Sequence, residues 1–596
     1  MEQHFNLLSE PWIKVIDLKS SEEKTVSLQE LFDHAVDYRQ LAGDTRSQDL
    51  ALLRFLLAIL TTVYSRFDAD DQPYDWLEFE DEFRVNPEMD VETEETEADL
   101  RKTWLSLYER GGFTPVLIEY LNHWAPRFDL FGETPFYQVS KADFDDHVPA
   151  KKRLTSQTIA KKTGTVAVKQ LNRRISESNN SPALFAPKTT VYKNQITLPE
   201  LARWLITYQN FTGVTDKTKV EAPEKFSISP GWLYKLNPIY LAGANLFETL
   251  MMNLVLYEDV PNWSPMQKPV WEFDHVSDYV TAAQVDSTPD NLAELYTLWS
   301  RLLHIEWQAD EPVIFSAGLP MPSPANAFIE PMTTWRLPDK QKEIRPATRN
   351  LQHLGEAMWH NFGQYVPVNT EHDLENGHQR VPGVVTWLEE MKEEAGLDSR
   401  ILSLVSVTLI SDGNATSQSP AAEYSDDLTM NSRVLFDQST VNYWPQHIEE
   451  VIENTQTVGN DYFVLARQVA ELRNFDAPAE FANRMRAKFY DRLNEPFKAW
   501  LASLSRNDDR NEKKLAWYQQ LKQIVNQTVD EELKQTAGPR DFRGVVNEAG
   551  SQSGKASPEN IFIAIGFFKG RLAKHLASTG VMKWQRRLKL KKQQQK

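Results

Sequence analysis

The sequence predicts an α+β protein in which a large mixed α/β domain precedes a C-terminal four-helix bundle. Over about the first 440 residues, short apolar and β-branched runs alternate with helical patterns and turns. From about Tyr443, apolar residues instead recur every three or four positions over long stretches, as in helices that bury one face. A chain of 596 residues has room for several domains. We expect the mixed domain at residues 1–440, the bundle at 441–580 and a basic tail at 581–596.

The N-terminal elements follow from local patterns. Asn6–Leu8 and Trp12–Ile16 are predicted to form a hairpin, with Ser9–Pro11 as its turn. A buried apolar helix is expected over residues 47–67. Residues 88–99 then hold seven carboxylates and no basic group, a density that favours an extended, solvated loop.

Two helices and a strand are predicted later in the mixed domain. Residues 198–210 carry apolar side chains at helical spacing, and residues 245–256 are apolar around much of the helix, which predicts burial. Between them lies a loop, Gly213–Pro230. Ile401–Ile410 alternates weakly and is rich in β-branched residues, so we expect a buried strand that ends near Gly413.

Four helices are predicted to form the bundle. The first is expected over residues 448–472, the second over 481–501 and the third over 515–533, each with a stripe of apolar side chains. The fourth begins at Ser557-Pro558-Glu559, because serine is a good N-cap and proline is tolerated at the first helical position. Short links between consecutive helices favour antiparallel packing.

The composition excludes several classes of protein. The chain has no cysteine, which removes disulfides, thiolate catalysis and cysteine-ligated zinc, and suits a reducing compartment. Lys and Arg number 65 against 84 Asp and Glu, a net charge of −19, so the molecule as a whole repels phosphate and anionic lipid. The most apolar run, Phe55–Tyr64, is much shorter than the about 20 residues of a membrane span. We therefore expect a cytoplasmic protein that meets nucleic acid only through local basic patches or a partner.

Two segments are positively charged, although the chain as a whole is negative. Residues 151–174 hold eight Lys and Arg and no acid, and they lead into a polar stretch rich in Ser and Asn. This composition fits a solvated surface loop, and it also fits a segment that follows a phosphate backbone, because its cations displace condensed counterions. The tail holds seven basic residues within 583–596, which is typical of a solvated chain end.

No catalytic motif is signalled. Residues 550–557 (GSQSGKAS) hint at a phosphate-binding loop, but the spacing of the glycines is one residue short and Ala556 replaces the Mg²⁺-binding hydroxyl. One cluster has metal-ligand residue types, although its short polar stretch favours a turn; its members are Glu371, His372, Asp373, Glu375 and His378. We expect no catalytic activity, no metal and no cofactor. The alternatives are a metal-dependent phosphohydrolase centred on His372, Asp373 and His378, and a purely structural protein scaffold.

Six short motifs occur in a characteristic order. They are Phe5–Ile13 (FNLLSEPWI), Phe131–Gln138 (FGETPFYQ), Leu201–Leu205 (LARWL), Gly243–Thr249 (GANLFET), Gly318–Pro320 (GLP) and Gly413–Thr416 (GNAT). Together with the terminal bundle, this set resembles the CasA family, the large subunit of the type I-E CRISPR surveillance complex called Cascade. The resemblance covers nearly the whole chain.

The resemblance implies a binding subunit. Such a subunit would lie at the 5′ handle of the guide RNA, read a short protospacer-adjacent motif (PAM) in double-stranded DNA, start strand separation and recruit a helicase–nuclease. Guide pairing would supply most of the sequence information. The implied partners are therefore the other Cascade subunits, the guide RNA, the target duplex and the helicase–nuclease, with no membrane.

The resemblance also implies a wedge that enters the duplex beside the PAM. It corresponds to Gly413, Asn414, Ala415 and Thr416, where the typical wedge of the family has Gln in place of Asn414. A small amide side chain on a tight glycine turn can both donate to and accept from base edges. An ordinary turn at the end of a strand is the alternative.

Two further loops take roles from the resemblance. The loop that contacts the guide-RNA handle and a neighbouring subunit corresponds to residues 175–185, with flanking phosphate ligands and polar contacts at Arg173, Arg174, Asn179 and Asn180. A loop that lies against the minor groove corresponds to Gly213–Pro230. In the family this loop is rich in glycine, whereas here Gly213 is its one glycine and Lys217 or Lys219 would supply charge. The family can also place a lysine before the strand that leads to Gly318, where this chain has Glu311.

Overall fold

The computed structural model describes the chain in two compact units. Unit 1 comprises residues 1–354, 372–397 and 403–427, and unit 2 comprises residues 355–371, 398–402 and 428–596. The described residues within them are 4–86, 89, 91, 93–161, 164–171, 195–214, 216, 218–285, 288–308, 311–337, 343–366, 381–397, 400–411, 413, 420–437, 439, 443–546 and 558–578. The basic tail predicted at 581–596 lies outside them, and the domain boundary predicted at residue 440 stays a prediction.

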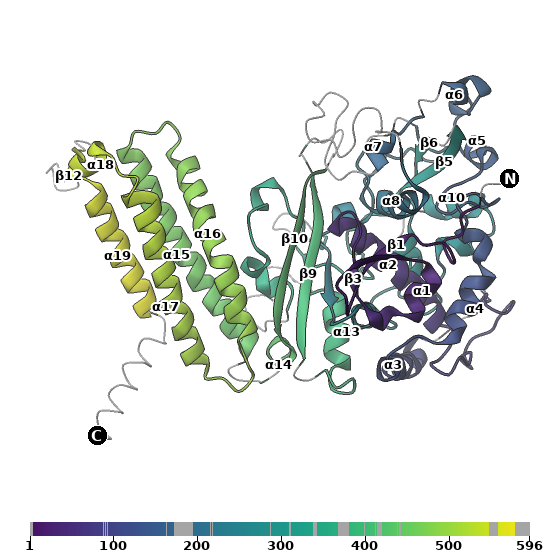
Figure 1. Ribbon diagram of the computed structural model, residues 1–596, viewed down its shortest axis with the longest axis horizontal. Helices are drawn as coiled ribbons and strands as arrows, with labels where there is room; N and C mark the ends of the chain where they lie inside the picture. Colours follow the sequence, from purple (N-terminus) through teal and green to yellow (C-terminus); the bar gives the residue numbers. More distant parts are fainter. Residues whose placement is uncertain are drawn as a thin grey trace. The chain divides into compact units, whose positions relative to one another are not determined.

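The predicted α+β class is confirmed (Figure 1). Unit 1 mixes helices with small sheets, whose strand orders are β2-β1-β3, β10-β9-β4, β5-β6 and β7-β8. Unit 2 is mainly helical. Apart from β9 and β10, which cross the boundary between the units, the strands of these sheets are β1 (Ile13–Asp17), β2 (Glu23–Val26), β3 (Tyr38–Leu41), β4 (Ile239–Ala242), β5 (Arg301–Gln308), β6 (Glu311–Gly318), β7 (Trp335–Arg336) and β8 (Arg345–Pro346).

The prediction that Trp12–Ile16 pairs with Asn6–Leu8 in a hairpin is wrong. β1 pairs antiparallel with β2, Ile13 opposite Val26, and not with Asn6–Leu8. The chain reverses between them at a polar turn in which Ser21 adopts a positive φ of 59°. Leu7 instead uses its carbonyl to accept from the Trp12 indole at 2.9 Å. The residues before Pro11 therefore fix the core through side chains and loop contacts rather than through a ladder.

The helix predicted over residues 47–67 is confirmed as α2 (Arg46–Tyr64), capped by the Thr45 side chain. Its residues after Arg46 are buried, and Phe55 packs edge-on against the rings of Phe136 and Trp271. Buried Arg54 is paired with Glu330 by two hydrogen bonds of 2.7 and 2.9 Å. By length and composition α2 could cross a membrane, yet it lies entirely inside unit 1.

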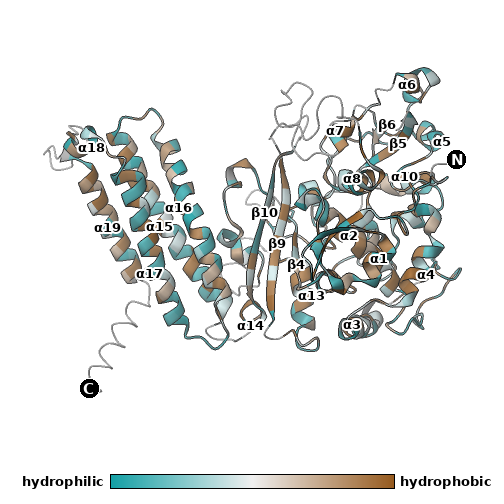
Figure 2. Cartoon of the chain, viewed as in Figure 1, coloured by the Kyte–Doolittle hydropathy of each residue, from teal (hydrophilic) through white to brown (hydrophobic). Residues whose placement is uncertain are grey.

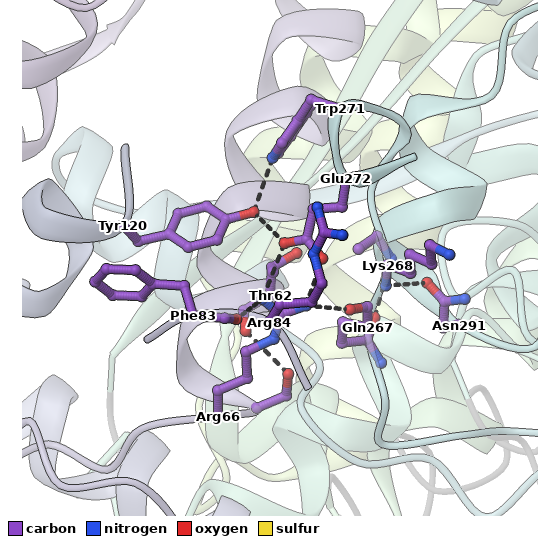
Figure 3. A network of polar contacts seen from close by, with 12 residues as sticks. Thr62, Arg66, Phe83, Arg84, Tyr120, Gln267, Lys268, Trp271, Glu272 and Asn291 are labelled. Carbon is purple, nitrogen blue, oxygen red and sulfur yellow. Dashed lines mark hydrogen bonds and ion pairs between the residues drawn. The ribbon is translucent and has the colours of Figure 1, made fainter. Parts of the chain in front are cut away.

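A polar network next to the end of α2 fixes several core side chains (Figure 3). Arg66 donates to both carboxylate oxygens of Glu272, at 2.9 and 2.8 Å, and to two backbone carbonyls. The Tyr120 hydroxyl donates to Glu272 at 2.6 Å and accepts from the Trp271 indole at 2.8 Å. Because every link is buried and hydrogen-bonded, the Trp271 ring is held in one orientation.

The loop predicted over the acidic segment 88–99 is wrong for its second half, because α3 (Thr93–Arg110) begins inside the segment. Carboxylates are favoured in the first turn of a helix, where the unpaired N–H groups carry partial positive charge. The helix is then held by Leu100, Trp104 and Leu107, which are fully buried on one face.

The helices predicted at 198–210 and 245–256 are confirmed as α8 (Leu198–Phe211) and α9 (Leu246–Asn253), capped by Thr197 and Asn245. Further helices of unit 1 are α1 (Leu28–Asp33), α4 (Pro115–His123), α5 (Lys141–His147), α6 (Ser156–Ala160), α7 (Val168–Leu171), α10 (Val276–Ala283), α11 (Leu292–Thr297) and α13 (Gly383–Met391). Short 3₁₀ turns are η1 (Ala35–Asp37), η2 (Ala125–Phe128), η3 (Ala150–Lys152), η4 (Leu233–Lys235), η5 (Val270–Glu272) and η6 (Leu351–His353).

The strand predicted at Ile401–Ile410 is confirmed as β9 (Ile401–Ser411). It lies between β10 (Pro420–Asn431) and β4. β4 runs antiparallel to β9, with Ile239 opposite Ser406. β9 ends at Ser411, two residues before Gly413, and β10 begins at Pro420.

The bundle helices of unit 2 match the predicted stripes. They are α15 (Trp444–Leu472), α16 (Pro478–Ala502), α17 (Arg510–Thr528) with a π-helical turn (Val529–Lys534), and α19 (Ile561–Ser578). The α16 stripe is buried, including Phe489, Leu493 and Phe497, and Figure 2 shows apolar residues along much of α19. Shorter elements of unit 2 are η7 (Met358–Gln364), α14 (Ser432–Leu435), α18 (Pro539–Arg543), β11 (Val545–Val546) and β12 (Pro558–Glu559).

The predicted start of the last helix is wrong by about one turn. α19 begins at Ile561, and the Asn560 side chain accepts from the amide of Ile563 at 3.0 Å, as an N-cap does. Pro558–Glu559 instead pairs with Val545–Val546 in a two-stranded sheet. A proline without an N–H is tolerated in such a short edge strand, so its presence alone did not mark the helix.

Candidate nucleic-acid interface

Strand β6 contacts the loop Gly213–Pro230 and the described part of the basic segment. One edge of β6 pairs with β5 along its length, with Arg301 opposite Gly318 at one end. The other edge, here called the β6 edge, receives two isolated bridges, one from Val166 to Ile314 and one from Lys219 to Gly318. Four residues of strand, about 13 Å, separate the two anchor points.

The first anchor holds the middle of the basic segment. The amides of Thr165 and Val166 donate to the Ile314 carbonyl at 2.8 and 3.2 Å, and the Ser316 amide donates to the Thr165 hydroxyl at 2.8 Å. Gly164 adopts a φ of +49°, and a Cβ there would lie 2.5 Å from the Ile314 carbonyl oxygen. This approach needs glycine. The chain then enters α7, which ends at Leu171.

The second anchor holds the loop Gly213–Pro230. The Gly318 amide donates to the Thr218 carbonyl at 2.9 Å, and the Val220 amide donates to the Gly318 carbonyl at 3.1 Å. Lys219, between these contacts, is exposed. Its ammonium donates to the Phe226 carbonyl at 2.6 Å and lies 4.9 Å from the centroid of the Phe226 ring. The loop therefore presents a fixed cation at the surface.

Arg301 ties the two ends of the same loop together from inside. Its side chain is fully buried, donates to Asp216 at 2.5 Å and contacts the carbonyls of Gly213 at 2.7 Å and Ser229 at 3.0 Å. Gly213 is itself buried, so its backbone is used within the protein. The charge of Asp216 is likewise neutralised by Arg301 and does not offset the exposed Lys219.

The segment that leaves the loop is hydrogen-bonded to β9. The Thr408 hydroxyl donates to the Leu236 carbonyl at 3.0 Å, and the Val407 amide donates to the Pro238 carbonyl at 3.2 Å. From Thr408 the chain needs five residues, about 16 Å, to reach Gly413, which adopts a φ of +78°. Glycine is favoured at that backbone conformation, and residues 414–419, on which the predicted wedge falls, lie outside the described residues.

Lys235 lies beside this loop on η4. Burial, and after it the charge of Arg301, lowers the pKa of Lys235 to about 8. Its ammonium donates to the Pro322 carbonyl at 3.5 Å. With this pKa the Lys235 side chain is still mostly protonated at neutral pH, and an approaching anion would favour the charged form further.

The start of the basic segment is on the surface of unit 1. Lys151, Lys152 and Arg153 are exposed around η3. Glu311, by contrast, begins β6 opposite Gln308, at the far end of the strand from Gly318. The position at which the family can carry a lysine therefore lies about 23 Å along β6 from the loop anchor.

The comparison with protein families identifies the chain. The family model for CRISPR-associated protein Cse1 matches residues 6–528. The chain belongs to the Cse1 family. No curated protein matches it.

Solved structures of the Cse1 family share the fold. The crystal structure of Thermobifida fusca Cse1 has 22% sequence identity and a TM-score of 0.71, and the match covers 96% of this chain and 98% of that chain. Thermus thermophilus CasA (Cse1) has 18% identity and a TM-score of 0.62, covering 96% and 99%. A chain from a CRISPR RNA-guided surveillance complex has 13% identity and a TM-score of 0.56, covering 89% and 99%. The resemblance to the CasA family is thus confirmed.

The predicted site residues of this Cse1 family member divide into two sets. The described ones are Gly413 at the turn after β9, buried Gly213 and exposed Lys219. The predicted residues that lie outside the described ones are Arg173, Arg174, Asn179, Asn180, Lys217, Asn414, Ala415 and Thr416. For the residues of the second set, the structure describes segments that precede them in the chain. These segments include Gly164 at the β6 edge and Thr408 on β9.

The alternative metal cluster also lies outside the described residues, because residues 367–380 are not among them. In the part of the chain that the structure describes, no group of three or more His, Asp or Glu could hold a metal ion.

Sequence reasoning missed Arg301 and Gly164. Gly164 carries a usable signal, since a lone glycine next to a strand-forming Thr-Val pair is typical of a close backbone approach. Arg301 carries none, because its partner Asp216 lies 85 residues earlier in the chain.

Proposed function

We propose that this protein is the large, non-catalytic subunit of a type I-E CRISPR surveillance complex. In this role it recognises the protospacer-adjacent motif in double-stranded DNA, starts strand separation and recruits the helicase–nuclease. The observation that carries the proposal is the β6 edge, where the segment leading to Arg173 and the loop bearing Lys219 are anchored four residues apart. One rigid strand can then present a guide-RNA contact and a duplex contact together.

Family membership supports the same assignment. The Cse1 family model covers residues 6–528, and a chain from a CRISPR RNA-guided surveillance complex shares the fold over 89% of this chain. The partners proposed on this basis are the other subunits of the complex, the 5′ handle of the guide RNA, the target duplex and the helicase–nuclease.

The duplex contacts are proposed for two elements. Exposed Lys219 supplies a cation for phosphate, and Phe226 beneath it limits the positions of that cation. The wedge is proposed at Gly413, Asn414, Ala415 and Thr416, because the turn at Gly413 ends a long strand held by β4. The amide of Asn414 can hydrogen-bond a base edge in either sense.

The wedge is tested in the assembled complex with Asn414→Ala. We expect weaker binding of a motif-bearing duplex with assembly intact, while Asn414→Gln, which keeps the amide and lengthens its reach, retains discrimination. Affinities for motif-bearing and motif-lacking duplexes are compared by equilibrium binding. Unchanged discrimination in Asn414→Ala would remove the wedge assignment.

The guide-RNA contact is tested with the double substitution Arg173→Glu and Arg174→Glu. Incorporation of the subunit into the complex should fall, because two phosphate ligands become anionic. Lys19→Glu with Lys102→Glu makes the same charge change at two exposed lysines outside the basic segment and serves as the matched control, which should assemble normally. Normal incorporation of the Arg173 and Arg174 variant would exclude the contact, and phosphoester turnover by the wild-type subunit would exclude the non-catalytic role.

A further inference from the structure

Two arginines of unit 1 lie side by side on a short hairpin. β7 and β8 form an antiparallel ladder in which Trp335 is opposite Pro346 and Arg336 is opposite Arg345. Trp335 and Pro346 are buried, whereas both arginines are exposed. Side chains directly opposite one another lie on the same face of a ladder, with Cβ atoms about 4.5–5.5 Å apart. The hairpin therefore presents two neighbouring arginine side chains to solvent, here called the arginine pair.

The hairpin is fixed to the body of unit 1. The Trp335 ring packs edge-on against the Phe328 ring, with centroids 5.2 Å apart. The Asn326 side chain accepts from the amide of Ile344 at 3.0 Å, and the Asn326 amide donates to the Ile344 carbonyl at 2.9 Å. Because the residue before Arg345 is held by two hydrogen bonds, the backbone that carries the arginine pair has a defined position.

The arginine pair carries more charge than its neighbours neutralise. Arg345 forms an ion pair with Glu343 at 3.0 Å, and both side chains are about half exposed. Arg336 forms no ion pair with the residues that the structure describes. Residues 336–345 hold four Lys and Arg against two Asp and Glu, a net charge of +2 within a chain of −19. Like charges directly opposite in a ladder are destabilising, so an anion that contacts both arginines would relieve their repulsion.

A phosphate group matches this arrangement. A guanidinium group donates two parallel hydrogen bonds to oxygens that lie in a fork, and it stays charged at every physiological pH. The two non-bridging oxygens of one phosphodiester can each accept from one arginine of the pair. A protein carboxylate offers a similar fork, so the position of the hairpin has to decide between these anions.

The position of the hairpin favours the target duplex as the source of the phosphate. Gly318 anchors the loop Gly213–Pro230, which bears Lys219. Eight residues of chain lead from Gly318 to Asn326, which holds the hairpin, a span of at most about 29 Å. One turn of duplex DNA is about 34 Å long. Lys219 and the arginine pair can therefore contact phosphates within about one turn of the same duplex.

We propose that the arginine pair binds one backbone phosphate of the target duplex. The contact fixes the position of the duplex beside the loop Gly213–Pro230. It carries no base information, because it reaches the backbone alone. The inference rests on the proposed function, since it needs a duplex that is bound by the assembled complex.

The arginine pair is tested in the assembled complex with Arg336→Gln and Arg345→Gln combined. We expect the affinity for a duplex to fall several-fold, and equally for motif-bearing and motif-lacking duplexes. The slope of log affinity against log salt should become shallower by about 1, because one phosphate contact is lost. Arg336→Lys with Arg345→Lys keeps both charges and should retain the slope. Titration of a labelled duplex at several salt concentrations measures both quantities.

A matched control and a stability measurement accompany these variants. Arg39 and Arg110 are exposed arginines of β3 and α3, so Arg39→Gln with Arg110→Gln removes the same charge elsewhere on unit 1 and should bind a duplex like the wild type. The melting temperature of the free chain should stay unchanged or rise in the Arg336 and Arg345 glutamine variant, because the repulsion between the arginines is gone. A large fall would show that the arginines stabilise the hairpin without a ligand, and would overturn the proposal.

The outcomes separate this inference from the proposed function. If the wild-type complex binds no duplex, both fail. If it binds a motif-bearing duplex and the glutamine variant of the arginine pair keeps its affinity and salt slope, the phosphate contact alone is wrong. If that variant fails to enter the complex, the arginines contact guide RNA or a subunit, and the duplex assignment is overturned. If inorganic phosphate raises the melting temperature of the wild-type chain alone while duplex binding is the same in both, the site holds free phosphate and the duplex assignment is again overturned.

Discussion

Arg301 is the residue on which the loop Gly213–Pro230 depends most directly. We expect Arg301→Gln to lower the free energy of unfolding by about 3–5 kcal/mol, because Asp216 stays buried without its partner. Urea denaturation of the variant measures the loss. Adding Asp216→Asn should recover part of it, since the buried charge is then removed as well. A loss below about 1 kcal/mol would mean that water reaches Asp216.

Glu294 gives the stability of the chain a measurable pH dependence. Burial, and then the charge of Asp290, raises its pKa from 4.5 to about 7. Between these values the folded state binds more protons than the unfolded state, so the free energy of unfolding falls as the pH rises from about 4.5 to about 7. Glu294→Gln should remove this part of the decline. Denaturation of both proteins at pH 5 and pH 8 is the measurement, and parallel curves would contradict it.

Single residues mark the limit of what the sequence predicts about the site. The left-handed backbone conformation of Gly413 was predictable, because a strand followed by Asp-Gly-Asn has a clear signal. The buried role of Gly213 and the pairing of Asp216 with Arg301 were not. Many acids could pair with a given arginine, and only the packing of distant segments selects one.

At the scale of elements, the β6 edge makes a prediction about Gly164. Substituting Gly164→Ala places a Cβ 2.5 Å from the Ile314 carbonyl oxygen at a φ of +49°, so the backbone must move away. Hydrogen exchange at the amides of Thr165 and Val166, which both donate to that carbonyl, should become faster. Gly112→Ala, where a Cβ meets open space, is the control. Unchanged exchange in Gly164→Ala would show that the contact tolerates a side chain.

Elements with a long, regular pattern were predictable and short ones were not. The apolar stripe from Phe481 to Leu501 predicted α16 nearly over its full length. Burial of one face is the main source of stability in a helix of that length, and it leaves a regular pattern in the sequence. The predictions of the hairpin partner of β1 and of the start of α19 were wrong, because a proline such as Pro11 or Pro558 is compatible with a turn, a helix N-terminus or an edge strand. Tertiary contacts decide which of these local structures forms.

At the scale of the whole molecule, the net charge of −19 predicts how the isolated chain meets DNA. Binding to a duplex should be weak and should decline only shallowly with added salt, because the proposed duplex contacts include few cations, Lys219 among them. Titration of a labelled duplex at several salt concentrations measures both quantities. Nanomolar, sequence-independent binding by the chain alone would contradict it.

Because Ile314 and Gly318 belong to one short strand, the roots of the two loops keep a fixed spacing whatever the length of the loops themselves. Residues can be gained or lost beyond Leu171 or between Val220 and Pro230 with both attachments intact. A single residue inserted into β6 between Ile314 and Gly318 would turn the backbone groups of one attachment toward the opposite edge of the strand, which pairs with β5. A change in the length of either loop would therefore alter its reach alone, whereas a change in the length of β6 would alter the spacing of both attachments.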